Sequence, residues 1–147
     1  MSYFLDTSAL VKIYHRESGT SELLEIYKGE QSITISQLAK IEFFSTMHRK
    51  LRDGEIDEKT LGIVMDKFEH DTEERYEIAA FTSFVLEEAY RLIGKFAKRY
   101  SLRTLDSLQF AFFTTYHDKG DIFVCADKKL IQVVQLEGYS AWIPENA

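Results

Sequence analysis

Apolar and polar positions along the chain alternate between the period of a strand and the period of a helix. Short apolar or β-branched runs predict strands at residues 3–5, 32–36, 77–81 and 122–126, with a last short strand before Pro144. Between them, apolar residues recur at helical spacing. The expected helices cover residues 9–14, 22–28, 37–52, 57–71, 85–100, 105–117 and 128–134. This alternation is typical of an α/β fold with a central, mostly parallel sheet of about four to five strands flanked by helices.

Two of the expected helices differ in how their apolar residues are distributed. In residues 85–100 these residues form one stripe, which predicts a helix with a single face toward the core. In residues 105–117 they surround nearly the whole circumference, which predicts a buried helix. Hydroxyl residues stand at three expected helix starts and are predicted to be N-caps: Ser36, Ser83 and Thr104.

Length and composition favour one domain over residues 1–147, with 45% apolar residues available for its core. The single cysteine and the scattered histidines give little support to a zinc site or a disulfide. No apolar run approaches the roughly 18 to 20 residues that span a bilayer, and Asp6 interrupts the first one. We therefore expect a cytoplasmic protein without membrane segments.

The formal net charge of −6 is unevenly distributed. Residues 53–77 hold ten acidic residues against three basic ones, whereas the rest of the chain has a balance of +1. The acidity is thus confined to one segment, which we expect to form a solvated helical arm. The net charge consequently does not exclude RNA as a partner.

An aspartate follows two of the expected strands directly and precedes a helix in both cases. Asp6 follows residues 3–5, and Asp127 follows residues 122–126. In open parallel sheets, ligands bind beyond the carboxyl ends of the strands, so both side chains are candidates for one shared site. Helix capping is the commoner role for a single aspartate at such a position, and it contributes about 1 kcal/mol. Two such strands from opposite ends of the domain favour the shared site.

Two further acidic residues are less strongly indicated by their positions. Asp106 lies in the first turn of the helix that we expect to be buried, where a carboxylate needs either a cation or a Lys or Arg partner. Periodicity leaves both options open. Glu42 lies away from the apolar stripe of its helix, on a face shared with Arg49. A solvated or Arg49-paired glutamate is therefore the simplest interpretation of that position.

Five stretches of the chain, in this order, resemble the PIN-domain ribonucleases of the VapC toxin type. They are FLDTSALVKIY, ISQLAKIEF, LRTLDSLQFAFF, FVCADKKLIQ and GYSAWIP. The resemblance covers nearly the whole chain and implies a single PIN-like domain. It also implies a metal-dependent endoribonuclease that leaves 5′-phosphate and 3′-hydroxyl ends, with a cognate antitoxin and a homodimer as expected assemblies. The acidic arm would then contribute to dimerisation and antitoxin docking.

The resemblance assigns the catalytic and metal-binding roles to four carboxylates. These are Asp6, Glu42, Asp106 and Asp127, which would hold Mg²⁺ or Mn²⁺. It places three hydroxyl residues beside them: Thr7, Ser8 and Thr104. Cys125 is a departure, because the family often has Thr or Ser near the end of that strand, and one supporting hydrogen bond is therefore in question.

Basic residues near the expected crevice are candidates for binding RNA phosphates, which supply affinity without sequence choice. They are Lys12, Arg16, Lys128 and Lys129, although each is individually compatible with an ordinary surface charge. Tyr14 and Trp142 are candidates for base stacking or for core packing, and His15 for a phosphate contact. Two other functions stay open: a PIN nuclease of RNA processing without an antitoxin, and a PIN domain that binds RNA or protein without cutting.

Overall fold

The computed structural model describes residues 1–145, and five strands form one sheet there. The strand order is β3-β2-β1-β4-β5, and every neighbouring pair is parallel. The expected α/β fold with a parallel sheet is therefore confirmed. The strands are β1 (Tyr3–Leu5), β2 (Ile33–Ser36), β3 (Tyr76–Ala79), β4 (Ile122–Val124) and β5 (Ser140–Trp142).

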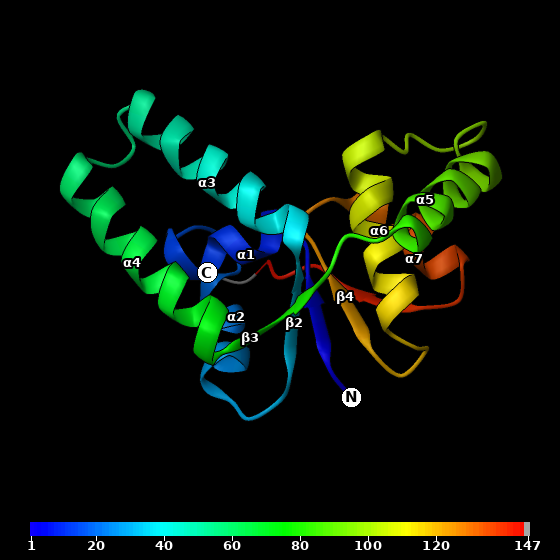
Figure 1. Ribbon diagram of the computed structural model, residues 1–147, viewed down its shortest axis with the longest axis horizontal. Helices are drawn as coiled ribbons and strands as arrows, with labels where there is room; N and C mark the ends of the chain where they lie inside the picture. The colour runs from blue at the N-terminus through cyan, green and yellow to red at the C-terminus, as the bar shows by residue number, and fades with distance from the viewer. Residues whose placement is uncertain (146–147) are drawn as a thin grey trace.

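Seven helices in the same part of the chain cover both faces of the sheet. Helices α1 to α4 lie on one side of the strands and α5 to α7 on the other, as Figure 1 shows. Their bounds are α1 (Thr7–Tyr14), α2 (Thr20–Lys28), α3 (Gln37–Arg52), α4 (Glu58–Glu74), α5 (Ser83–Phe96), α6 (Thr104–Tyr116) and α7 (Lys128–Leu136). None of these helices is both long and apolar enough to cross a membrane.

The sheet divides the core into two layers because successive residues of a strand point to opposite faces. In β1, Phe4 packs with the helices α5 to α7, whereas Leu5 packs with α1 to α4. Phe123 and Val124 divide in the same way in β4. Both faces are buried, which explains why β1 and β4 lack alternating polar residues.

Several predicted details were wrong by a residue or a face. Ser36 caps α3, as expected, by accepting a hydrogen bond from the Ala39 amide. The cap of α5 is Thr82 instead of Ser83. Thr104 is the first residue of α6, and no side chain caps that helix.

Helices α3 and α6 are also less buried than their patterns indicated. The apolar spacing of α3 predicts a core position for Phe44, which is instead 53% exposed, while Phe43 next to it is fully buried. Leu105 and Tyr116, at the two ends of α6, are also exposed, so only the middle of that helix is enclosed.

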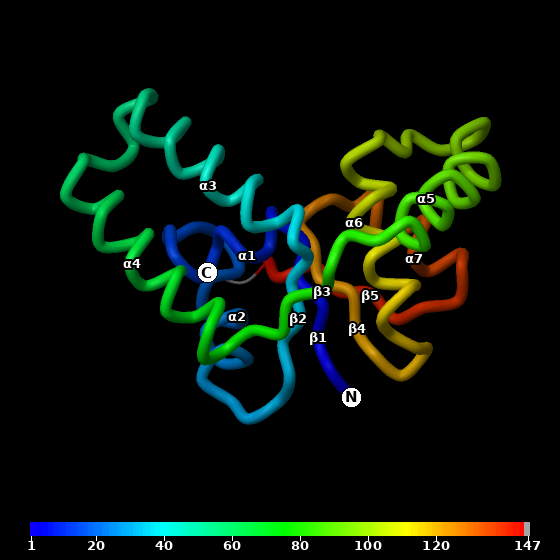
Figure 2. The backbone as a smooth tube through the Cα atoms, in the orientation of Figure 1, coloured from blue at the N-terminus to red at the C-terminus, as the bar shows by residue number. Residues whose placement is uncertain are grey.

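Helices α3 and α4 form an antiparallel hairpin that projects from the sheet, and the acidic residues 53–77 lie mostly on it (Figure 2). The arm is anchored at its base by a buried carboxylate. Asp71 accepts hydrogen bonds from the hydroxyls of Tyr14 (2.5 Å) and Tyr27 (2.8 Å), so α4 is tied to α1 and α2. One of the acids predicted to be solvated is thus internal. Of the two roles suggested for Tyr14, base stacking and core packing, this contact corresponds to core packing.

Candidate active site

The candidate site lies where the strand order reverses direction. β1 is flanked by β2 on one side and by β4 on the other, so the connections that leave β1 and β4 diverge at their carboxyl ends. Asp6 directly follows β1, and Asp127 follows β4 after two residues. Both aspartates are N-caps, of α1 and α7 respectively. The fold therefore brings the two strand-end aspartates to the same edge of the sheet.

Asp6 is held by one carboxylate oxygen. Its Oδ1 accepts hydrogen bonds from the Ser8 hydroxyl (2.7 Å) and the Ala9 amide (3.0 Å). The side chain is nearly enclosed, and this burial raises the pKa of Asp6 to about 7 although both hydrogen bonds act to lower it. The negative charges of Asp106 and Glu42 raise the pKa further. Asp6 is therefore a carboxylate whose charge lacks a compensating cation.

Ser8 connects the ends of the two central strands. While its hydroxyl donates to Asp6, the same oxygen accepts a hydrogen bond from the Ala126 amide at 3.0 Å. Ala126 lies just before Asp127, so Ser8 links one aspartate to the segment that carries the other. The role of Ser8 beside the metal-binding carboxylates stays a prediction.

Glu42 on α3 is held by two donors from other helices. Its Oε1 accepts hydrogen bonds from the Thr7 hydroxyl and from Nε2 of Gln109, both at 2.8 Å. Gln109 is itself fixed because its Oε1 accepts a hydrogen bond from the Ser36 hydroxyl (3.1 Å). No ion pair joins Glu42 to Arg49 in the described residues. The Arg49 pairing was therefore wrong, and Glu42 is a partly exposed glutamate held by two side chains.

Gln109 is the residue of this site that sequence reasoning missed. It is 3% exposed on the predicted buried helix, where it is flanked by Leu108 and Phe110. A buried amide needs hydrogen-bond partners, so a glutamine inside an otherwise apolar helix was the available signal.

Asp106 and Asp127 complete the acidic set. Asp106 is half-buried, and its pKa is raised by burial and by the charges of Asp127 and Glu42, while Arg103 acts to lower it. Asp127 is exposed, and its Oδ1 accepts a hydrogen bond from the Lys129 amide at 2.8 Å. Thr104 lies exposed at the start of α6, two residues before Asp106.

Three of the four carboxylates share one arrangement. In each, the hydrogen bonds from residues 1–145 fall on a single oxygen and leave the second oxygen without a protein donor. They are Asp6, Glu42 and Asp127. One oxygen thus orients the side chain while the other can bind a cation.

The donor set fits a hard divalent cation held by few protein ligands. No Lys, Arg or His in residues 1–145 forms an ion pair with any of the four carboxylates. Within the same residues, no three His, Cys, Asp or Glu side chains converge closely enough to enclose a metal. Mg²⁺ does not require such an enclosure, because it keeps several waters and is usually bound by one or two carboxylates together with substrate phosphates.

The residues predicted to bind RNA divide into buried and exposed ones. Lys12 is buried: its Nζ donates to the Ser18 carbonyl (2.7 Å) and lies 3.3 Å from Oε1 of Glu17. It is therefore part of the interior, which corrects its expected place on the surface. The others are exposed and accessible to a ligand: Arg16, Lys128 and Lys129.

The aromatic and sulfur-containing candidates lie mostly inside the fold. Trp142 packs partly buried against the α1 to α4 layer, and Tyr14 contacts Asp71. His15 places Nδ1 3.8 Å from Oε2 of Glu17. Cys125 is fully buried, and burial raises the pKa of its thiol; its Sγ contacts the Asp127 carbonyl at 3.5 Å.

Comparison with protein families matches residues 3–135 to the PIN domain. The chain belongs to the PIN domain family. No curated protein matches the chain in sequence. Solved structures of similar fold include FitAcB from Neisseria gonorrhoeae (12% identity, TM-score 0.73, 97% of each chain covered). VapBC2 from Rickettsia felis, bound to a fragment of its promoter DNA, has 15% identity and a TM-score of 0.70, with 97% of this chain and 98% of that chain covered.

A third similar structure is VapC20 from Mycobacterium tuberculosis, a toxin that cleaves the sarcin-ricin loop. It has 14% identity and a TM-score of 0.66, and the alignment covers 94% of this PIN domain and 96% of that chain. At these identities the likeness establishes the shared fold. The arrangement of the carboxylates supplies the chemical argument for function.

Proposed function

We propose that this PIN domain is a Mg²⁺- or Mn²⁺-dependent endoribonuclease and the toxin of a toxin–antitoxin pair. The observation that carries the proposal is the set of four unpaired carboxylates at the carboxyl edge of the sheet, three of which keep one oxygen free of protein donors. Carboxylate oxygens without cationic partners favour binding of a divalent metal ion. Toxins among the similar structures support the biological role.

The metal would be held by one or two carboxylates at a time, together with waters and a substrate phosphate, drawn from Asp6, Glu42, Asp106 and Asp127. A bound metal would polarise the scissile phosphate and lower the pKa of an attacking water. The protein contributes orientation: Ser8 and the Ala9 amide fix Asp6, while Thr7 and Gln109 fix Glu42. The expected products carry 5′-phosphate and 3′-hydroxyl ends.

The proposal is tested by cleavage of a structured RNA pool with Mg²⁺ or Mn²⁺ by the wild type, Asp6→Asn and Asp106→Asn. The expected result is metal-dependent cutting that both variants lose while their circular dichroism spectra stay native. A wild type that neither cuts this pool nor tRNA and rRNA, and that binds no Mn²⁺, would contradict the nuclease assignment. It would instead favour a PIN domain that binds without cutting.

The arm formed by α3 and α4 carries a groove that suits an antitoxin segment. Its volume is about 450 Å³, and apolar side chains line it together with the acidic Glu69 and Glu73 and the basic Lys40. Exposed Ile41 and Phe44 extend its apolar floor. An amphipathic segment with basic residues would complement both features. We assign this groove to the antitoxin.

This assignment is tested with a small protein encoded beside this chain. Glu69→Lys combined with Glu73→Lys is expected to weaken binding of that partner, whereas reversing Glu58, at the other end of α4, should not. Equal binding by both variants would refute the docking site. Absence of any such partner would favour a nuclease of RNA processing.

A further inference from the structure

A pocket of about 310 Å³ adjoins the carboxylates on the side of α3 and has no role in the chemistry described so far. At one end it reaches Thr7, Ser8 and Ala126, which contact the acidic site. At the other end it reaches residues near the carboxyl terminus of α3. The pocket therefore leads from the candidate metal site toward the tip of the arm.

One face of α3 forms the wall of this pocket. Glu42, Thr46 and Arg49 line it, and their spacing of four and three residues places them in one row along the helix. At a rise of about 1.5 Å per residue, Arg49 is about 10 Å along the helix axis from Glu42. A substrate strand that leaves the carboxylates along α3 would thus meet the hydroxyl of Thr46 and then the guanidinium of Arg49.

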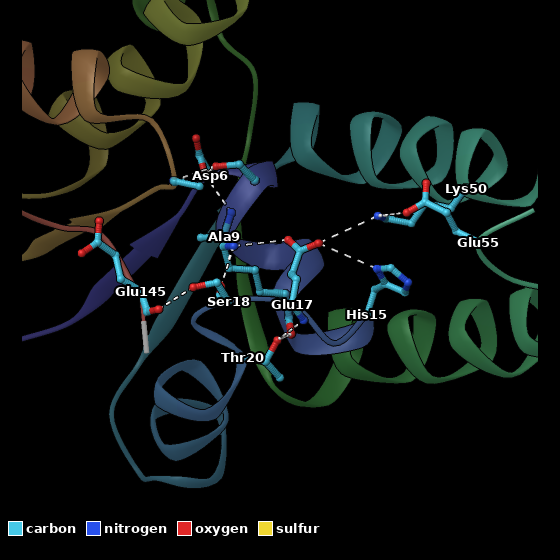
Figure 3. A network of polar contacts seen from close by, with 12 residues as sticks. Asp6, Ala9, His15, Glu17, Ser18, Thr20, Lys50, Glu55 and Glu145 are labelled. Atoms are coloured by element: carbon cyan, nitrogen blue, oxygen red, sulfur yellow. Dashed lines mark hydrogen bonds and ion pairs between the residues drawn. The ribbon is translucent and has the colours of Figure 1, made fainter. Parts of the chain in front are cut away.

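The other charges around the pocket are already paired. Glu17 lies 3.3 Å from Nζ of Lys12 and 3.9 Å from Nζ of Lys50. Lys50 also lies 3.6 Å from Oε1 of Glu55. Figure 3 shows the Lys50 ammonium turned toward Glu17 and Glu55. Two lysines and two glutamates thus neutralise one another.

Arg49 differs from this group because its side chain is exposed and forms no ion pair or hydrogen bond within residues 1–145. Its positive charge is uncompensated, although Glu17 and Glu42 line the same pocket. A guanidinium is well suited to a phosphate because its donors match two phosphate oxygens at once. The hydroxyl of Thr46 would supply a further donor to such a group.

We propose that Arg49 binds an RNA phosphate that neighbours the scissile one, with Thr46 lining the path between them. The inference rests on the proposed ribonuclease function and names a substrate contact for that same site. It transfers to Arg49 the role that the sequence suggested for Lys12, whose charge is buried beside Glu17. Arg49 would position the strand and take no part in the bond that breaks.

The test compares Arg49→Ala, Arg49→Lys and the control Lys40→Ala in the full chain. Lys40 is an exposed cation nine residues earlier on α3, which is two and a half turns, so it faces the opposite side of the helix. The measurements are KM and kcat for cleavage of a single-stranded RNA, and RNA binding in EDTA at several salt concentrations.

Arg49→Ala is expected to raise KM several-fold with little change in kcat. It should also reduce the slope of log affinity against log salt by about 0.7, the value for one phosphate contact with a single strand. Arg49→Lys should keep most of the slope because it keeps the charge, and Lys40→Ala should keep all of it. Thermal unfolding should be unchanged in all three, since neither exposed cation contributes to the core.

Two results would overturn the inference, and they are distinguishable. If the wild type cuts RNA and Asp6→Asn does not, but Arg49→Ala matches Lys40→Ala in KM and salt slope, Arg49 is no phosphate contact while the proposed function stands. If the wild type neither cuts nor binds RNA, the proposed function and this inference fail together.

Discussion

Replacing Gln109 by Met tests whether the buried amide holds the candidate site together. Methionine has a similar length and keeps the apolar contacts of α6, but it cannot donate to Glu42 or accept from Ser36. A hydrogen bond to a charged group contributes about 1.5–3 kcal/mol. Glu42 keeps its bond from Thr7 and has access to water. We therefore expect the free energy of unfolding to fall by about 2 kcal/mol.

The functional consequence of Gln109→Met should exceed what this loss of stability explains. Residues that orient metal ligands typically contribute 10- to 100-fold to metal affinity or activity. Mn²⁺ titration and RNA cleavage, both at a temperature where the variant is folded, should show a loss in that range. Urea unfolding supplies the stability difference in the same preparation.

The matched control is Gln132→Met, which makes the same replacement at an exposed position of α7. It should leave unfolding, Mn²⁺ affinity and cleavage unchanged. If Gln109→Met behaves like this control in all three measurements, the amide does not orient Glu42. The account of the Thr7–Glu42–Gln109 contacts as the support of the site would then be wrong.

Three further substitutions test the fold, each by urea unfolding. Burial would raise the pKa of Asp121, but hydrogen bonds from Ser2 and His117 lower it to about 2. Asp121→Asn should therefore lower the free energy of unfolding by about 2 kcal/mol at pH 7 and at pH 5. Since the stabilisation is complete above the ordinary pKa near 4, this difference should shrink as the pH falls toward 2. Tyr14→Phe, which removes a donor to a buried carboxylate, should lose about 1–3 kcal/mol. Phe113→Ala, in the centre of the core, should lose about 3–5 kcal/mol.

Each of these three has a control of the same chemistry at an exposed position: Asp118→Asn, Tyr90→Phe and Phe84→Ala. The controls should change the free energy of unfolding by less than about 0.5 kcal/mol. If a variant and its control lower the free energy of unfolding by the same amount, burial and hydrogen bonding do not govern the stability of that region. A constant difference for Asp121→Asn between pH 7 and pH 3 would refute its low pKa.

Most elements of the fold were predictable because period and turn signals act locally. Helix bounds moved by a few residues where a neighbouring hydroxyl took the cap, as at Thr82. The exposure of Phe44 was not predictable, since apolar spacing cannot tell a core face from a face that covers a groove. Such a distinction depends on which segments pack on the helix.

Some residues of the candidate site were predictable from the sequence and others were not. Asp6 and Asp127 stand where strand pattern ends and helix pattern begins, so the topology alone brings them together. Glu42 gave no such signal, because its partners Thr7 and Gln109 are 35 and 67 residues away in the chain. The burial of Lys12 depends in the same way on Glu17 and on the loop at Ser18.

Helix capping and metal binding were posed as alternatives for Asp6, and the geometry makes them compatible. The cap and the Ser8 hydroxyl both use Oδ1, which fixes the rotation of the carboxylate and leaves Oδ2 without a donor. Asp127 repeats the arrangement at α7 with the Lys129 amide. Because the cap fixes one oxygen of the carboxylate, the second oxygen is already oriented before a metal binds. The side chain that caps the helix would therefore lose less conformational entropy on binding a metal. The strand–aspartate–helix pattern therefore favours a metal site, because aspartate can cap the helix with one carboxylate oxygen and bind a metal with the other.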